Sequence, residues 1–219
     1  MTTTPKRLYC ALVIDESGSM GTLRQATIDG ANGWLGDQRK DGPEDLLTLV
    51  TFDAPPDPTK PRVRVLYDGV PLKEVVELTE ANYNPQGNTP LYDAIGATIS
   101  RIEADVRSTD RTVVLVVMTD GLENASEEYT REAIAAKIEQ KERDGWTIMY
   151  LGANQDAKEV AAGMCLDADF AVTYASTRRG TARAYDASSN ATSQLRSGRT
   201  RSAASASLHA ASATEEAPL

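Results

Sequence analysis

Residues 8–19 read LYCALVIDESGS, and this stretch decides both the fold and the position of a candidate site. The run from Leu8 to Ile14 is apolar, which is typical of a strand that is buried on both faces of a sheet. Three oxygen-bearing residues, Asp15, Ser17 and Ser19, follow it at alternate positions. The stretch therefore predicts a buried strand whose carboxyl end carries polar side chains.

Further apolar runs alternate with segments of helical period along the chain. We predict strands at Leu8–Ile14, Leu46–Phe52, Arg62–Tyr67, Thr112–Met118, Thr147–Leu151 and Phe170–Thr173, and helices at Thr22–Arg39, Pro90–Val106, Glu127–Arg143 and Gln155–Met164. Charged and apolar residues alternate in Arg62–Tyr67, as in a half-exposed edge strand. We expect an α/β fold of the Rossmann-like, doubly wound kind. Its central sheet is mostly parallel, with one antiparallel edge strand and helices on both faces.

Two other polar segments lie where strands end or helices begin. Residues 87–93 read GNTPLYD before a predicted helix, and residues 119–121 read TDG after the most apolar strand. Binding loops of parallel sheets gather at the carboxyl ends of the strands. The three segments together offer the hard oxygen ligands that a divalent cation prefers.

These three segments resemble the loops of von Willebrand factor A domains, over about residues 5–175. In that family, the loops form the metal-ion-dependent adhesion site. The resemblance implies five metal ligands: Asp15, Ser17, Ser19, Thr89 and Asp120. It also implies a protein-binding module, and the chain looks like the stand-alone bacterial and phage members of the family.

The ligand set indicates the metal and the partner. Ser17, Ser19 and Thr89 offer neutral oxygens as direct ligands, and the two aspartates offer charge through coordinated waters. We expect Mg²⁺ or Mn²⁺ rather than Ca²⁺. An ion with mostly neutral direct ligands retains affinity for one more anion. The hypothesis is that a partner protein supplies this ligand from an Asp or Glu carboxylate.

Capping is the simpler explanation for several of these residues. Asp15, Ser17 and Thr89 could each cap a following helix, although capping does not explain Asp120. Among nearby residues, we interpret Glu16 as a solvated loop charge and Asp93 as a helix-face residue. Asn124 could orient a ligand loop or cap the next helix, and we favour the cap.

The chemistry of known enzymes fits the sequence less well. Ser17 stands where an Asp-x-Asp phosphatase would have its second carboxylate, and no phosphate-binding loop motif is present. The single histidine, His209, lies near the carboxyl terminus, which argues against catalysis that needs a positioned imidazole. We expect no enzymatic activity, and a metal-dependent hydrolase is the least favoured alternative.

Charge and composition divide the chain near residue 177. Residues 1–177 hold 17 of the 23 Lys and Arg and 29 of the 32 Asp and Glu, a net charge of −12, whereas residues 178–219 carry +3. The acidic body argues against a nucleic-acid partner. We predict a domain at 1–177 and an Ala/Ser/Arg-rich tail at 178–219, with a helix at Thr181–Arg196. From Gly198 to Leu219, the tail is expected to be disordered or to fold only on a partner.

Location and partners follow from what the sequence lacks. No apolar stretch is long enough for a membrane span, and residues 1–7 do not resemble a signal peptide. We therefore expect a cytoplasmic adaptor, with an AAA+ ATPase as one candidate partner. The alternative is a structural component of a virion that uses the tail as an arm. Cys10 and Cys165 are expected to be free core thiols, although a disulfide between them stays open.

Overall fold

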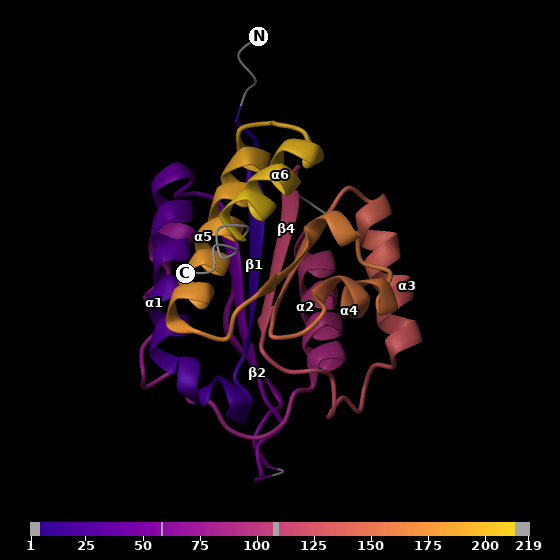
Figure 1. Ribbon diagram of the computed structural model, residues 1–219. Helices are drawn as coiled ribbons and strands as arrows, with labels where there is room; N and C mark the ends of the chain where they lie inside the picture. The colour runs from indigo at the N-terminus through magenta and orange to yellow at the C-terminus, as the bar shows by residue number, and fades with distance from the viewer. Residues whose placement is uncertain (1–4, 58, 107–109, 213–219) are drawn as a thin grey trace, which may run out of the picture.

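One six-stranded sheet forms the centre of the described part of the molecule. The computed structural model describes residues 5–57, 59–106 and 110–212 (Figure 1). The strands, in chain order, are β1 (Leu8–Asp15), β2 (Leu46–Phe52), β3 (Val63–Pro71), β4 (Thr112–Thr119), β5 (Thr147–Ala153) and β6 (Ala171–Tyr174). Their order in the sheet is β3-β2-β1-β4-β5-β6. Only β3 is antiparallel to its neighbour, so the predicted mostly parallel sheet with one antiparallel edge strand is confirmed.

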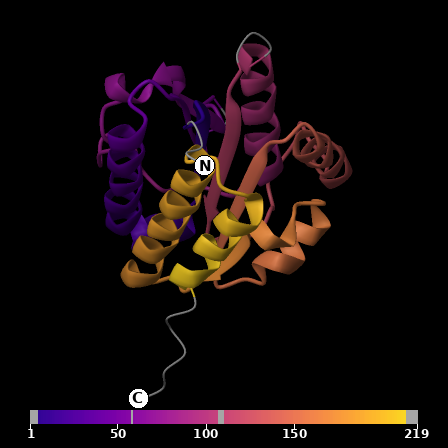
Figure 2. The same cartoon turned by 90° about the horizontal axis from the view of Figure 1, so that it is seen from above.

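Helices cover both faces of this sheet, as the doubly wound prediction requires. They are α1 (Arg24–Asp41), α2 (Leu91–Val106), α3 (Arg131–Arg143), α4 (Ala157–Gly163), α5 (Arg178–Arg196) and α6 (Arg201–Ser212). Figures 1 and 2 show α1, α5 and α6 on one face and α2, α3 and α4 on the other. Short 3₁₀ helices lie at Gly18–Leu23, Leu72–Glu74 and Ala168–Phe170.

The central strands are buried along their length, which explains their continuous apolar sequences. Every residue of β1 is buried, and β4 is buried from Val113 onward. The two strands pair in parallel, with Ile14 opposite Met118. Because parallel strands end at the same edge, the loops that follow β1 and β4 lie next to each other.

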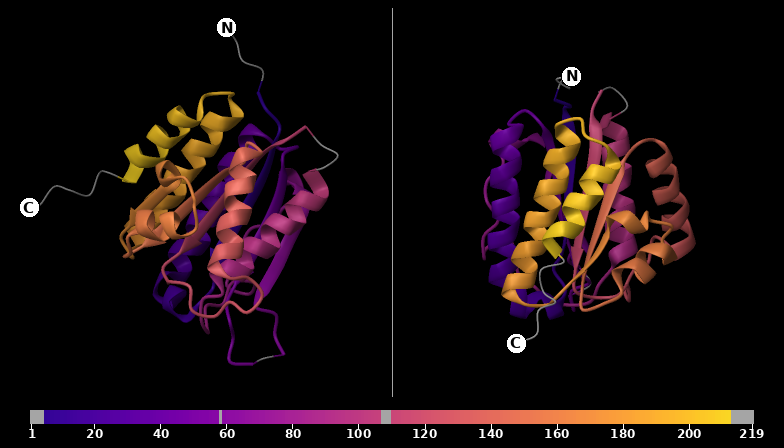
Figure 3. Two further views of the ribbon diagram at one scale, coloured as in Figure 1. Left: turned by 90° about the vertical axis from the view of Figure 1, so that its right-hand side faces the viewer. Right: turned by 45° about the horizontal axis from the view of Figure 1, so that its top comes forward.

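The carboxyl-terminal segment differs from the predicted tail. Residues 178–196 and 201–212 form α5 and α6, which lie side by side over the sheet (Figure 3). Helix α5 packs against α1 and buries Tyr185 and Leu195. The predicted helix at Thr181–Arg196 is therefore present within α5, whereas the disorder predicted from Gly198 does not describe α6. The predicted disorder of residues 213–219 falls outside the described residues.

Small residues and internally bonded hydroxyls explain how this polar segment packs. A Cβ atom built on Gly30 of α1 would lie 2.2 Å from the Tyr185 ring, so Gly30 provides the space for that ring. The buried hydroxyls of Ser188 and Thr192 donate to the carbonyls of Tyr185 and Ser188 in their own helix. Hydroxyls satisfied in this way can be buried at little cost.

A buried ion pair joins the end of α5 to the start of the sheet. Arg196 Nε donates to Asp45 Oδ2 at 2.8 Å, and both side chains are buried. Asp45 Oδ1 also accepts the backbone N–H of Leu8, and the carbonyl of Arg196 accepts that of Lys6. These contacts fix α5 to the amino-terminal ends of β1 and β2.

Replacing Arg196 tests this attachment. We expect Arg196→Met to lower the free energy of unfolding by about 3 kcal/mol, because Asp45 would lose a buried charge partner. Arg199→Met is the matched control, since Arg199 is exposed beyond α5. Chemical denaturation of the full chain measures both. Equal effects of the two substitutions would contradict a structural role for the ion pair.

Two further expectations concern the thiols and the membrane. Both cysteines are free, and Cys10 is buried as expected, but Cys165 is exposed rather than in the core.

Within residues 5–57, 59–106 and 110–212, no helix combines the length and apolar character of a membrane span.

Candidate functional site

The predicted ligand residues come from three loops at the carboxyl edge of the sheet. Asp15 is the last residue of β1, and Asp120 directly follows β4. Thr89 lies just before α2. The backbone links these loops: Gly18 N donates to the carbonyl of Gly87, and Asn124 N donates to that of Thr89.

Hydrogen bonds bring the five side chains into one cluster. The Ser19 hydroxyl donates to Asp120 Oδ1 at 2.5 Å and lies 3.2 Å from the Ser17 hydroxyl. Asp15 Oδ1 accepts the backbone N–H of Ser17 at 2.7 Å. A Cβ atom built on Gly121 would lie 2.8 Å from the Thr89 hydroxyl and 3.7 Å from Asp15 Oδ2. The structure therefore groups all five residues around the same point.

The two carboxylates of the cluster are partly desolvated. Burial raises the pKa of Asp15 to about 6, and the nearby Asp120 adds to the increase. Burial also raises the pKa of Asp120, against the effect of the Ser19 hydroxyl. Loss of hydration makes the ionised forms costly, and a cation beside them would stabilise both.

The donor set fits a small, hard cation. Two carboxylates and three hydroxyls provide oxygen atoms without nitrogen or sulfur, which suits Mg²⁺ or Mn²⁺. In the described part of the chain, no group of three or more His, Cys, Asp or Glu side chains could hold a metal. A metal bound here would therefore depend on Ser17, Ser19 and Thr89 as well as on the aspartates.

Thr119 is a member of the site that the sequence analysis did not assign. The Thr119 hydroxyl donates to Asp15 Oδ2 at 2.6 Å, and the Thr119 hydroxyl oxygen accepts the backbone N–H of Gly121 at 3.0 Å. Thr119 thus holds the Asp15 carboxylate and the turn after β4 together. In the sequence, only its position next to Asp120 in the TDG segment could have indicated this role.

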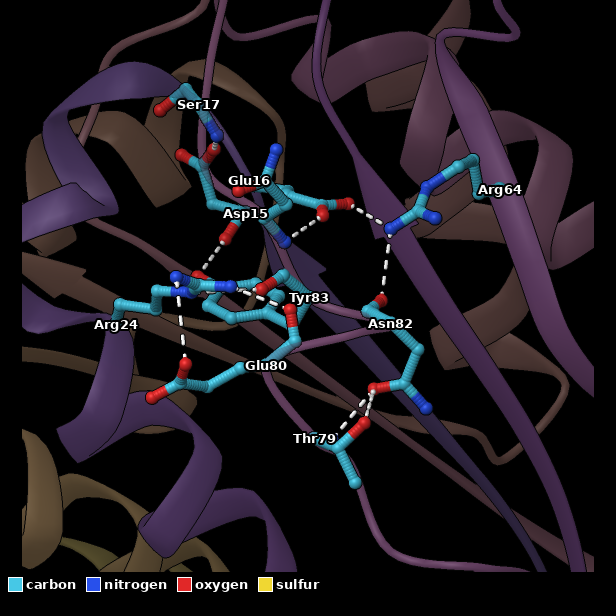
Figure 4. A network of polar contacts seen from close by, with 10 residues as sticks. Asp15, Glu16, Ser17, Arg24, Arg64, Thr79, Glu80, Asn82 and Tyr83 are labelled. Carbon is cyan, nitrogen blue, oxygen red and sulfur yellow. Dashed lines mark hydrogen bonds and ion pairs between the residues drawn. The ribbon is translucent and has the colours of Figure 1, made fainter.

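Glu16 is a structural residue of the site and not the solvated charge that we expected. Its carboxylate accepts from Arg64 Nη2 at 2.5 Å and from the backbone N–H of Asn84, and the residue is 2% exposed. Figure 4 shows Glu16 directed at Arg64, away from Ser17. The carbonyl of Glu16 also accepts the N–H of Gln86. Glu16 therefore fixes the long loop that leads to Thr89.

Tyr83 fixes the same loop to the end of β1. Its buried hydroxyl donates to the carbonyl of Asp15 at 2.6 Å. Arg24 of α1 donates to the carbonyls of Glu80 and Tyr83, as Figure 4 shows. The connection before Thr89 is therefore bonded to β1 and to α1.

Asp93 and Asn124 also have roles that differ from the favoured interpretations. The Asp93 carboxylate is buried and accepts the backbone N–H groups of residues 127–129 at 2.8–3.0 Å. Asn124 Oδ1 accepts the N–H of Thr89 at 2.9 Å, so Asn124 orients a ligand loop. The cap of α3 is Thr130, which is why this helix begins at Arg131 rather than at Glu127.

Comparison with known proteins identifies the fold. Neither a protein-family model nor a curated protein matches the sequence. Among solved structures, the SpRpn10 VWA domain is similar to this chain at 11% identity and a TM-score of 0.54, covering 80% of this chain and 92% of that domain. The chain has the von Willebrand factor A fold. This agrees with the resemblance of its three loops.

Two larger proteins contain the same von Willebrand factor A fold. The pilus adhesin SpaC from Lactobacillus rhamnosus GG has a TM-score of 0.68 at 14% identity, over 86% of this chain and 30% of SpaC. The proximal thread matrix protein 1 of the mussel byssus, solved with a zinc-occupied MIDAS motif, has a TM-score of 0.60 at 11% identity, over 84% of this chain and 47% of that protein. This chain thus spans less than half the length of either protein.

Gly87 provides a test of the loop geometry. Its φ of +70° is left-handed, and an added Cβ atom would lie 2.2 Å from the carbonyl oxygen of Ala54. We expect Gly87→Ala to destabilise the chain by about 1–2 kcal/mol and to weaken metal binding, because the Thr89 loop must move. Chemical denaturation and calorimetric titration with Mg²⁺ measure the two effects.

Gly33→Ala is the control for this substitution. Gly33 lies in α1, with no atom within 4 Å of an added Cβ. Alanine there should stabilise the helix by about 0.5–1 kcal/mol and leave metal binding unchanged. Unaltered metal binding in Gly87→Ala would show that the Thr89 loop is not needed.

Asp53, which follows β2, gives a pH-dependent test. Burial raises its pKa from 3.8 to about 6, with Glu16 as the next cause, and its Oδ2 atom is buried with no hydrogen-bond partner. A raised pKa in the folded chain means that stability is lost as the pH rises from about 4 through 6. Asp53→Asn should remove this loss.

The expected gain for Asp53→Asn is about 1 kcal/mol at neutral pH, falling to near zero at the acidic end. Unfolding in EDTA across this pH range measures it. Glu77→Gln is the control, because Glu77 is exposed and its substitution should change little at either end. A gain that does not vary with pH would refute the charge-burial explanation.

Proposed function

We propose that this chain is a divalent-metal-dependent protein-binding module. The observation that carries the proposal is the cluster of Asp15, Ser17, Ser19, Thr89 and Asp120 at the carboxyl edge of the sheet. The zinc-occupied MIDAS motif of the mussel protein, in a domain of the same fold, supports a metal at this edge.

The metal would be Mg²⁺ or Mn²⁺, held by the three hydroxyls and the two aspartates. When bound, it would supply a Lewis-acidic point that attracts a further anionic ligand. The only charges of the ligand cluster are those of Asp15 and Asp120, so an Asp or Glu carboxylate from a partner would be accepted there. This is the adhesion and adaptor function that we propose.

A binding function fits the cluster better than hydrolysis does. The five ligand residues include no imidazole, thiol or amine that could act as a general base near neutral pH. His209 contacts the carbonyl of Asp169 from α6 and does not belong to the cluster. We therefore propose that the chain is not an enzyme.

The partner is proposed to be a protein in the cytoplasm, with an AAA+ ATPase as one candidate and a virion component as the other. An arm that orders only on assembly is not supported for residues 178–212, because α5 and α6 pack on the body of the domain. If the chain is a component of a particle, the metal edge is the surface that we expect to make the contact.

Metal binding is the first test of the function. Calorimetric titration with Mg²⁺ and with Mn²⁺ should show one binding event, which Asp120→Ala weakens by about tenfold or more. Glu77→Ala removes one exposed carboxylate elsewhere and should leave the affinity unchanged. Absence of binding in the unsubstituted chain would refute the metal site.

Partner capture is the second part of this test. A displayed library of random peptides, selected on the Mg²⁺-loaded chain, should yield peptides that contain Asp or Glu and are released by EDTA. Peptides without an acidic residue, or peptides that stay bound in EDTA, would contradict carboxylate capture.

A further inference from the structure

A groove lies beside the candidate metal site on the face of the sheet that carries α2, α3 and α4. It encloses about 500 Å³. The residues that matter for its chemistry are Leu91, Tyr92, Leu122, Arg131, Glu159 and Val160. Three of these six side chains, Tyr92, Leu122 and Val160, are at least partly exposed and largely apolar, so the groove differs from the polar ligand cluster next to it.

Leu122 contributes an exposed apolar side chain to this groove. It is 58% exposed, and among the described residues only it and Val76, at 68%, are exposed large hydrophobic side chains. Single exposed apolar residues are common on protein surfaces. Leu122, however, lies two residues after Asp120 and lines the groove, whereas Val76 does neither.

The loop that carries Leu122 is held in place by Glu123. The Glu123 carboxylate accepts the backbone N–H groups of Ala125, Ser126 and Tyr92 at 2.7–2.9 Å. The last of these bonds joins the loop to the first turn of α2. Leu122 is therefore presented from a fixed backbone, which lowers the entropic cost of a contact.

The groove and the ligand cluster share two loops, those that carry Thr89 and Asp120. Leu91 follows Thr89 by two residues on one wall, and Leu122 follows Asp120 by the same interval. Between them and α4, Gln155 Nε2 donates to the carbonyl of Gly121 at 3.5 Å. If a peptide carboxylate were bound at the metal, the residues adjacent to it in the peptide would thus reach the groove.

The charges at the rim are arranged asymmetrically. Arg131 lies at the start of α3, and the α4 side carries Asp156 and Glu159. Both acidic residues are exposed. The α4 rim is therefore complementary to a basic side chain.

We propose that the groove binds the residues next to the captured carboxylate in the same partner segment. The occupant is a peptide segment with an Asp or Glu for the metal, an apolar side chain that packs on Leu122, and a Lys or Arg beside Glu159. This inference rests on the proposed function, since the metal determines where the segment begins.

The library selection described above tests the groove when it is repeated on two variants. On the unsubstituted chain, the selected peptides should carry an apolar residue at a constant spacing from the Asp or Glu. Leu122→Ser should weaken binding of these peptides by about tenfold or more, whereas Val76→Ser should not. Both substitutions lie at exposed positions, and the Mg²⁺ affinity of each variant is measured first.

Glu159→Lys provides a second, independent readout. It should change the selected basic residue to an acidic one while the apolar position is kept. If peptides are acidic and metal-dependent but show no apolar residue, and Leu122→Ser binds them as tightly as Val76→Ser, the groove proposal is wrong and the metal function stands. If peptides are bound equally in EDTA, the proposed function itself fails.

Discussion

The parallel pairing of β1 with β4 is the constraint on which the rest of the structure depends. Both strands are buried, so their register is set by the core and not by the loops. This register places Asp15 and Asp120 at the same edge. Thr119, the last residue of β4, then bonds to the Asp15 carboxylate directly. The site is therefore a consequence of how the sheet core packs.

The third loop does not continue a strand of the sheet, and it is positioned by a β-bridge between Asn88 and Ala54 and by side-chain contacts. Glu16 and Tyr83 hold the connection that leads to Thr89, and Asn124 holds Thr89 itself. Each contact joins a ligand loop to a neighbouring loop or strand. A change in the position of one loop will therefore shift the others, as expected for a shared hydrogen-bond network.

The sequence predicted the sheet and the position of the three polar loops at its carboxyl edge, because both produce local patterns. Continuous apolar runs mark buried strands, and oxygen-bearing residues at alternate positions mark the loops. It predicted Glu16, Asp93 and Asn124 less well, since their partners Arg64, residues 127–129 and Thr89 are distant in the chain. Helices α5 and α6 were missed as parts of the body for another reason. Their buried hydroxyls look polar in sequence, although Ser188 and Thr192 are bonded within the helix.

The attachment of α5 has a consequence for the order in which the chain can fold during synthesis. Arg196 bonds to Asp45, a residue 151 positions earlier, and Tyr185 fits over Gly30 of α1. The part of the sheet that α5 covers therefore stays uncovered until residues 178–196 have been synthesised. Until then, the apolar residues that α5 covers are open to solvent, and exposed apolar surface of this kind favours aggregation of incomplete chains.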